Sequence, residues 1–316
     1  MTRPWARRNG ERLAVWALVL VLVLASVGTV YVQPHPVDER AVAAVVEDPS
    51  VTVVQTDTGY TVRVAGDGTD NANGSDATAG LILYPGGLVP KRAYLPLAAE
   101  VAAASGLTVF LVDVPLHLAV LDADAAGAVV EAHPEVDRWY VGGHSLGGAM
   151  ACRFAGEAAD RVEGVVLLGA YCDVDLRDTD LDALTVVGTR DAVVNREALA
   201  AARDRLPADA RFVAVEGMNH TQFGVYGGQV DDRGTVSDEK ARRQVAEAIA
   251  SWTAERGERS VDWGLGVDAR PTYGDAERVR AGDDSLRRTT AARTTSPSEA
   301  APEGWPSEHE SLDQSA

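Results

Sequence analysis

Between residues 41 and 255, short apolar runs alternate with longer segments in which apolar residues recur at the spacing of a helix. The short runs are typical of strands buried on both faces, and the longer segments of amphipathic helices. We expect strands at 51–56, 60–65, 81–84, 107–112, 138–141, 164–168, 184–188 and 211–215, and helices at 93–104, 124–132, 146–158, 196–205 and 237–253. This alternation predicts an α/β fold, with a mostly parallel central sheet and helices on both of its faces.

Residues 13–32 form a different pattern, an unbroken stretch without a charged residue. Its length suffices to span the roughly 30 Å hydrocarbon core of a membrane as a helix. Arginines precede the stretch and acidic residues follow it, so the positive-inside rule predicts a single-pass anchor with the rest of the chain extracytoplasmic. The alternative interpretation is a cleaved signal peptide and secretion.

The pattern therefore divides the chain into three parts. Residues 1–40 are the predicted membrane anchor, and residues 41–255 are the folded domain. Residues 256–316 are rich in Ser, Thr, Pro, Ala, Glu and Arg and show almost no apolar periodicity. Such a segment buries too little apolar surface to offset the entropy of ordering it, so we predict a disordered tail.

The charge narrows the choice of partners. Lys and Arg number 29 against 47 Asp and Glu, which gives a net charge of −18, and Lys91 and Lys240 are the only lysines. A chain this acidic repels nucleic acids and anionic membrane surfaces, so we expect no nucleic-acid partner. The acidic, lysine-poor composition predicts adaptation to high salt, with the codon bias of a GC-rich genome as the alternative.

The two cysteines, Cys152 and Cys172, are too few for a disulfide framework or a zinc site. Both lie in apolar surroundings, so we interpret them as small buried hydrophobic residues, with a single bridge between them as the alternative. The sequence indicates neither a metal nor an organic cofactor.

The strongest chemical motif is Gly143-His144-Ser145-Leu146-Gly147, between a predicted strand and a predicted helix. A G-x-S-x-G sequence in this setting is typical of a nucleophile elbow, a strained turn that exposes the serine hydroxyl above the sheet. We therefore predict Ser145 as a nucleophile, and His144 to point away from it.

A serine nucleophile needs a base and an acid further along the chain. His220 follows the last predicted strand, where catalytic groups collect, and is the predicted base. Asp191 follows the penultimate strand and is the predicted acid, whose task is to orient His220. Asp173 and Asp175, after the preceding strand, are the alternatives.

An oxyanion formed at Ser145 needs N–H donors. The N–H of Leu146, at the start of the predicted helix, is one candidate. The loop after the strand at 81–84 contains Gly86-Gly87-Leu88, so we expect Gly87 or Leu88 to supply the second donor.

The segment between the strands at 164–168 and 184–188 is too short for a cap domain, which predicts an open pocket. Leu116, His117 and Leu118 are candidates to line an acyl or alcohol pocket. The alternative is that they pack beneath their own loop.

Taken together, several segments resemble a minimal α/β-hydrolase family of the α/β-hydrolase-5 or dienelactone-hydrolase-like type. They are Tyr84–Val89, Val112–Leu121, Gly142–Ala151, Gly188–Asp191 and Glu216–Gly224. The resemblance covers about residues 80–250 and implies an α/β-hydrolase fold with a Ser145–Asp191–His220 triad. Dienelactone hydrolases have cysteine as the nucleophile where this chain has Ser145, so the resemblance does not extend to their substrate.

We therefore predict a serine hydrolase that cleaves a small-molecule carboxylic ester or thioester through an acyl-enzyme. One alternative is an acyltransferase that uses the same three residues. Another is a catalytically silent, membrane-anchored binding module on a hydrolase scaffold.

Overall fold

The computed structural model describes residues 33–66, 79–230 and 233–262, which all belong to one compact unit, Met1–Gly266. A second unit, Val267–Ala316, lies outside the described residues, as does the predicted membrane span at 13–32. Within the described ranges, no helix combines the length and apolar character that crossing a membrane requires.

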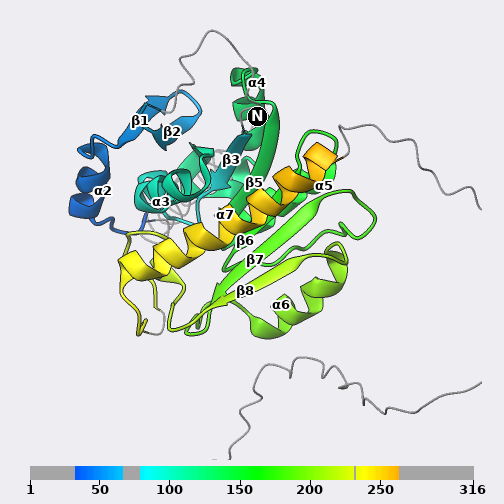
Figure 1. The fold of residues 1–316 in the computed structure, drawn as a ribbon. Coiled ribbons are helices and arrows are strands. Elements are labelled where there is room, and N and C mark those ends of the chain that lie inside the picture. Colours follow the sequence, from blue (N-terminus) through cyan, green and yellow to red (C-terminus); the bar gives the residue numbers. More distant parts are fainter. Residues whose placement is uncertain (1–32, 67–78, 231–232, 263–316) are drawn as a thin grey trace, which may run out of the picture. The chain divides into compact units, whose positions relative to one another are not determined.

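The core of the unit is one eight-stranded sheet with the strand order β1-β2-β4-β3-β5-β6-β7-β8 (Figure 1). β1 pairs antiparallel with β2 and β2 with β4, whereas all other neighbours are parallel. The strands are β1 (Val51–Thr56), β2 (Gly59–Val64), β3 (Ala79–Tyr84), β4 (Thr108–Val112), β5 (Arg138–His144), β6 (Gly164–Leu168), β7 (Asp182–Gly188) and β8 (Arg211–Val215). The predicted mostly parallel α/β sheet is thus confirmed.

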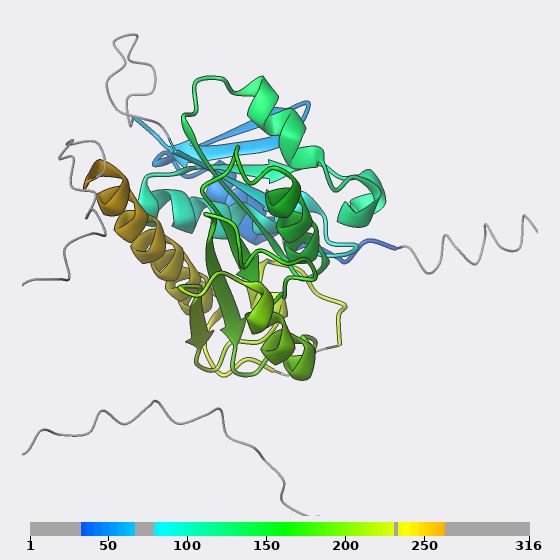
Figure 2. The ribbon, with the colours of Figure 1, turned by 90° about the vertical axis from the view of Figure 1, so that its right-hand side faces the viewer.

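Helices cover both faces of the sheet. The helices α2, α3 and α7 pack on one face, while α4 and α5 pack on the other; Figure 2 shows the orange α7 and the green α5 on opposite sides of the strands. The α-helices are α2 (Glu39–Val46), α3 (Leu95–Ser105), α4 (Ala125–Ala132), α5 (Leu146–Glu157), α6 (Arg196–Ala202) and α7 (Asp238–Asp262). Short 3₁₀ turns are η1 (Lys91–Tyr94), η2 (Pro115–His117), η3 (Ala119–Leu121), η4 (Arg203–Arg205) and η5 (Thr221–Phe223).

Two hydrophobic clusters explain why the predicted strands are continuously apolar. Along β3, Leu81 and Leu83 belong to the cluster beneath α3 and α7, whereas Ile82 and Tyr84 belong to the cluster beneath α5. Successive side chains of a strand point to opposite faces, and both faces are covered here. Both sets of side chains on such a strand are therefore buried.

Two features were not predicted. α2 begins at Glu39, inside the predicted anchor region 1–40, and ends before the first strand; Asp38 caps it by accepting the N–H groups of Arg40 and Ala41. α7 continues to Asp262, beyond the boundary expected at residue 255.

The parallel strands place distant residues together. Because the carboxyl ends of parallel strands lie at the same edge of a sheet, the segments that follow β3, β5, β6, β7 and β8 meet there. The predicted nucleophile, base, acid and oxyanion residues all lie in these segments.

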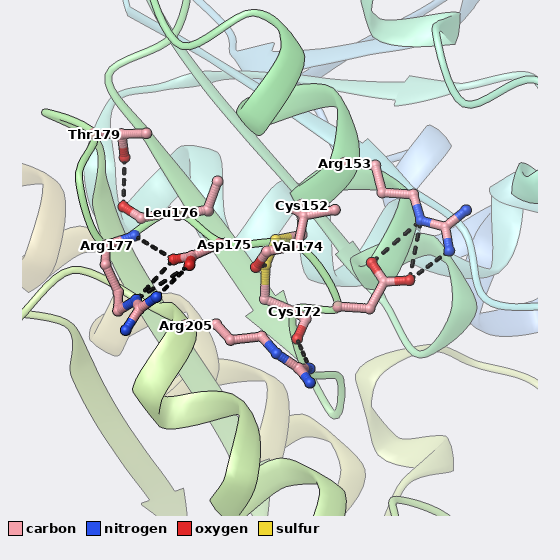
Figure 3. Close-up of a disulfide and its surroundings, with 10 residues drawn as sticks. Cys152, Arg153, Cys172, Val174, Asp175, Leu176, Arg177, Thr179 and Arg205 are labelled. Carbon is pink, nitrogen blue, oxygen red and sulfur yellow. Dashed lines mark hydrogen bonds and ion pairs between the residues drawn. A yellow bond between two sulfur atoms is a disulfide. The ribbon is translucent and has the colours of Figure 1, made fainter.

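Cys152 and Cys172 form a disulfide, which joins α5 to the segment after β6 (Figure 3). The interpretation as two unlinked hydrophobic residues was wrong, and the alternative of a single bridge holds. The reason is tertiary: α5 packs against β6, which brings the two Cα atoms to 5.6 Å across a sequence separation of 20 residues.

The disulfide should stabilise the domain by about 3 kcal/mol, because it closes a loop of moderate length in the unfolded chain. We expect urea denaturation to give a free energy of unfolding lower by about that amount when reductant is present. The double variant Cys152→Ala, Cys172→Ala should show no reductant effect. Equal midpoints for the oxidised and reduced wild-type protein would contradict a stabilising bridge.

Candidate active site

Ser145 stands in the turn between β5 and α5, with φ 53° and ψ −120°. A positive φ is costly for a residue with a side chain, and such strain is concentrated at functional sites. Ser145 is partly exposed, and its N–H donates to the carbonyl of Leu168 at 3.0 Å. The turn therefore presents the serine at the carboxyl edge of the sheet, as a nucleophile elbow does.

The glycines around Ser145 are required by close packing. A Cβ atom added to Gly143 would lie 2.5 Å from the carbonyl carbon of Gly147. A Cβ atom on Gly147 would collide with the carbonyl oxygens of Tyr84 and Pro85. The sharp turn thus brings strand and helix backbones into contact, which only glycine permits.

His220 and Asp191 form a buried pair. Nδ1 of His220 lies 2.8 Å from Oδ2 of Asp191, and both side chains are almost completely inaccessible to solvent. Oδ1 of Asp191 accepts the N–H groups of Val193 (3.0 Å) and Val194 (2.8 Å). The carboxylate is therefore fixed in place, and it holds the proton of His220 on Nδ1.

The two alternative acids lie elsewhere. Asp173 accepts a hydrogen bond from Nε of Arg153 at 3.0 Å. Asp175 is exposed and pairs with Arg177, whose hydrogen bond lowers the pKa of that carboxyl to about 2 (Figure 3). The structure brings Asp191, and neither of these residues, to His220.

Gly87 and Leu88 differ in what their amides do. The N–H of Leu88 donates to the carbonyl of His117 at 2.8 Å, so this amide is already engaged. A Cβ atom on Gly87 would lie 3.3 Å from Cδ2 of Leu146, which places Gly87 against the start of α5. As a correction to the sequence-based pair of candidates, Leu88 is not an available donor in this arrangement, and Gly87 remains.

Behind the elbow lies a buried polar network that the sequence analysis missed. The hydroxyl of Tyr94 accepts the N–H of Gly86 at 3.0 Å and lies 2.8 Å from Nδ1 of His144. The ring centroid of His144 is 4.4 Å from that of His220. Burial, and next the neighbouring His220, lower the pKa of His144, so His144 is neutral and accepts the Tyr94 proton.

A protein-family model covers the part of the chain that forms this site. The alpha/beta hydrolase family model matches residues 80–244, which include Ser145, Asp191 and His220. The chain belongs to the alpha/beta hydrolase family. The predicted family and enzyme class are thereby confirmed.

Solved structures similar to this α/β-hydrolase include three at low identity. A mutant of the esterase rPPE is 19% identical, with 67% of this chain and 87% of that chain covered and a TM-score of 0.48. An esterase domain from Rhodothermus marinus is 18% identical (65% and 98% covered, TM-score 0.47), and a dienelactone hydrolase from Anabaena variabilis is 17% identical (65% and 98%, TM-score 0.44). No curated protein matches the chain.

The candidate pocket residues of this α/β-hydrolase lie beside the Gly87–Leu88 turn. Leu116 is 67% exposed, whereas His117 and Leu118 lie in the loop that accepts the Leu88 N–H. Leu116 and His117 both have positive φ, 53° and 57°. Burial lowers the pKa of His117. Because Leu116 is mostly exposed, its side chain faces solvent and does not pack beneath its own loop.

Gly169 is a further site residue that sequence reasoning missed. It follows β6 with φ 52°, and a Cβ atom there would lie 3.1 Å from both Oδ2 of Asp191 and Nδ1 of His220. A glycine is therefore needed for the pair to pack against this turn. Among the described residues, no cluster of His, Cys, Asp and Glu is arranged to hold a metal ion.

Tyr94→Phe should destabilise the hydrolase domain by about 1–3 kcal/mol, because the N–H of Gly86 and Nδ1 of His144 then lose a buried partner. Urea denaturation measures the change. Tyr60→Phe is the control, since the contact of that ring with Lys91 does not need the hydroxyl. A Tyr94→Phe protein as stable as wild type would show that water replaces the hydroxyl.

Proposed function

We propose that this α/β-hydrolase cleaves carboxylic esters or thioesters through an acyl-enzyme on Ser145. The observation that carries the proposal is the buried Asp191–His220 pair, 2.8 Å apart, at the sheet edge where the strained turn presents Ser145. A serine activated by a histidine, itself oriented by a buried carboxylate, is the arrangement that acyl transfer requires.

In the first half of the reaction, Nε2 of His220 takes the proton of Ser145 as Oγ attacks the carbonyl carbon. Asp191 stays ionised and stabilises the imidazolium. The bond to the leaving alcohol or thiol then breaks as His220 returns the proton to the leaving atom. In the second half, His220 deprotonates water as the water oxygen attacks the acyl carbon. His220 then returns that proton to Oγ as the bond to Ser145 breaks, which releases the acid.

The developing oxyanion needs donors at the elbow. We assign this role to the N–H groups of Leu146 and Gly87. Leu146 is the first residue of α5, where backbone N–H groups have no partner within the helix and the helix dipole favours negative charge. Gly87 is a suitable second donor because a Cβ atom placed on it would lie 3.3 Å from the side chain of Leu146, so the two residues are adjacent.

We also propose that residues 13–32 anchor the protein with its catalytic domain extracytoplasmic, with secretion after cleavage as the alternative. The apolar stretch and its charged flanks support this location. The Cys152–Cys172 disulfide supports it independently, because disulfides persist mainly in oxidising compartments.

Labelling with a fluorophosphonate tests the serine directly. The full chain, assayed in high salt because of its −18 charge, should take up one label at Ser145 and hydrolyse p-nitrophenyl esters. The Ser145→Ala protein should take up none. Absence of labelling in the folded wild-type protein would favour the silent binding module.

Acyl transfer to an acceptor other than water is the second candidate, because it uses the same residues. Product analysis with added alcohols separates the two activities. A hydrolase releases mainly the free acid, whereas an acyltransferase releases mainly the new ester.

A further inference from the structure

The segment that directly follows the predicted membrane span is bound to the loops of the active site. The N–H of His35 donates to the carbonyl of Leu88 at 2.8 Å, in the loop that carries Gly87. The next residues attach to the loop that follows His220: Gly227 N–H donates to the Pro36 carbonyl (2.9 Å), Asp38 N–H donates to the Val225 carbonyl (2.9 Å), and Val37 forms a β-bridge with Tyr226. Two loops of the site thus hold residues 35–38.

The loop that follows β4, next to the Gly87–Leu88 turn, carries a group of exposed apolar side chains. Leu116, Val120 and Leu121 are 67%, 51% and 53% exposed, all within η2 and η3. These are three of the six large hydrophobic side chains that are exposed among the described residues. Such clustering marks an interaction surface, whereas single exposed apolar residues need no explanation.

Leu88 is hydrogen-bonded both to the segment 35–38 and to the loop that bears the exposed apolar side chains. Its carbonyl accepts the N–H of His35, and its own N–H donates to the carbonyl of His117. The segment after the predicted span, the Gly87–Leu88 turn and the apolar loop are therefore direct neighbours.

Chain length then limits how far the site lies from the membrane. His35 lies three residue steps beyond position 32, and an extended chain covers at most about 3.6 Å per step, or roughly 11 Å in all. With 13–32 spanning the bilayer, the Gly87–Leu88 turn and the loop bearing Leu116 are held close to its surface. At this distance, apolar side chains lose contact with water by entering the lipid interface.

We propose that the site faces the membrane and takes uncharged esters with an acyl chain that are dissolved in the bilayer, which enter past Leu116, Val120 and Leu121. This inference rests on the proposed ester hydrolysis and membrane anchor. The acidic chain repels anionic esters, so the proposed substrate is an uncharged one. The bonds made and broken are those of the acyl-enzyme cycle above.

The experiment uses the full chain in phosphatidylcholine vesicles at high salt, with two p-nitrophenyl esters. The acetate is dissolved in water, and the palmitate is dissolved in the bilayer. The double variant Val120→Ser, Leu121→Ser should lower the ratio of palmitate to acetate hydrolysis by about tenfold or more, since two apolar contacts with lipid are lost. Val46→Ser with Val54→Ser, which changes exposed valines on α2 and β1, is the matched control and should leave the ratio unchanged.

The possible outcomes distinguish the membrane-facing site from the proposed ester hydrolysis. If the ratio of palmitate to acetate hydrolysis is unchanged in the loop variant, or falls equally in the control variant, the proposal of a membrane-facing site is wrong. Hydrolysis of the acetate would still support the proposed function in either case. If the folded wild-type protein cleaves neither ester, the proposed function itself fails. Because the acetate rate also reports folding of the loop variant, the single variant Leu121→Ser replaces it if that rate collapses.

Discussion

We expect Ser145→Ala to lower kcat for ester hydrolysis by about 10⁴–10⁶-fold. The substitution removes the only oxygen of that side chain, so the acyl-enzyme cannot form and only oxyanion stabilisation and substrate binding remain. The domain should stay folded, because Ser145 is partly exposed and its backbone N–H still donates to the carbonyl of Leu168.

Initial rates on a p-nitrophenyl ester, with circular dichroism as the test of folding, measure this effect. Ser251→Ala is a matched control, since that serine is exposed on α7 and its hydroxyl forms hydrogen bonds with Arg211 and Glu255, which are not residues of the site. The control should retain wild-type kcat. If Ser145→Ala retains kcat within about tenfold, the acyl-enzyme mechanism is wrong.

The parts of this site that could be predicted from the sequence are those that local patterns encode. A strand, a G-x-S-x-G turn and a helix lie next to one another along the chain, so the elbow at Ser145 follows from 138–158 alone. His220 and Asp191 could be placed by their positions after strands, because parallel strands deliver such residues to one edge. The topology of the sheet then brings Asp191 and His220 into contact, and it places Ser145 at the same edge.

What could not be predicted depends on contacts between distant side chains. Tyr94 and His144 are 50 residues apart, and neither carries a local signal that the other is its partner. The hydrogen bond from the Leu88 N–H to the carbonyl of His117 is a similar case. It depends on how a separate loop folds, and the residues around Leu88 carry no signal for it. Hydrogen bonds of this kind are determined by tertiary packing, which a hydrophobic pattern does not specify.

The disulfide, too, depends on tertiary packing that the sequence pattern does not specify. Two cysteines in apolar segments are as compatible with separate burial as with a bridge, and only the packing of α5 on β6 decides between them.

We expect Asp191→Ala to lower kcat by about 10⁴-fold, and Asp173→Ala to leave it within about twofold. Without Asp191, His220 loses the acceptor that holds its proton on Nδ1, so the tautomer with a basic Nε2 facing the serine is no longer favoured. Asp173 instead pairs with Arg153 in a partly exposed position, and its loss removes a surface ion pair worth about 0–1 kcal/mol of stability.

The comparison between the two variants is sharper than either alone, because each removes one carboxylate that follows a strand of the same sheet. Steady-state kinetics in parallel with thermal unfolding separates a catalytic loss from a folding loss. Asp191→Asn adds a further test: it preserves the shape of the side chain but removes its charge, so it too should lose a large factor in kcat while staying folded. Should Asp173→Ala show the larger loss, the acid would have to be reassigned, and the buried Asp191–His220 pair would be structural.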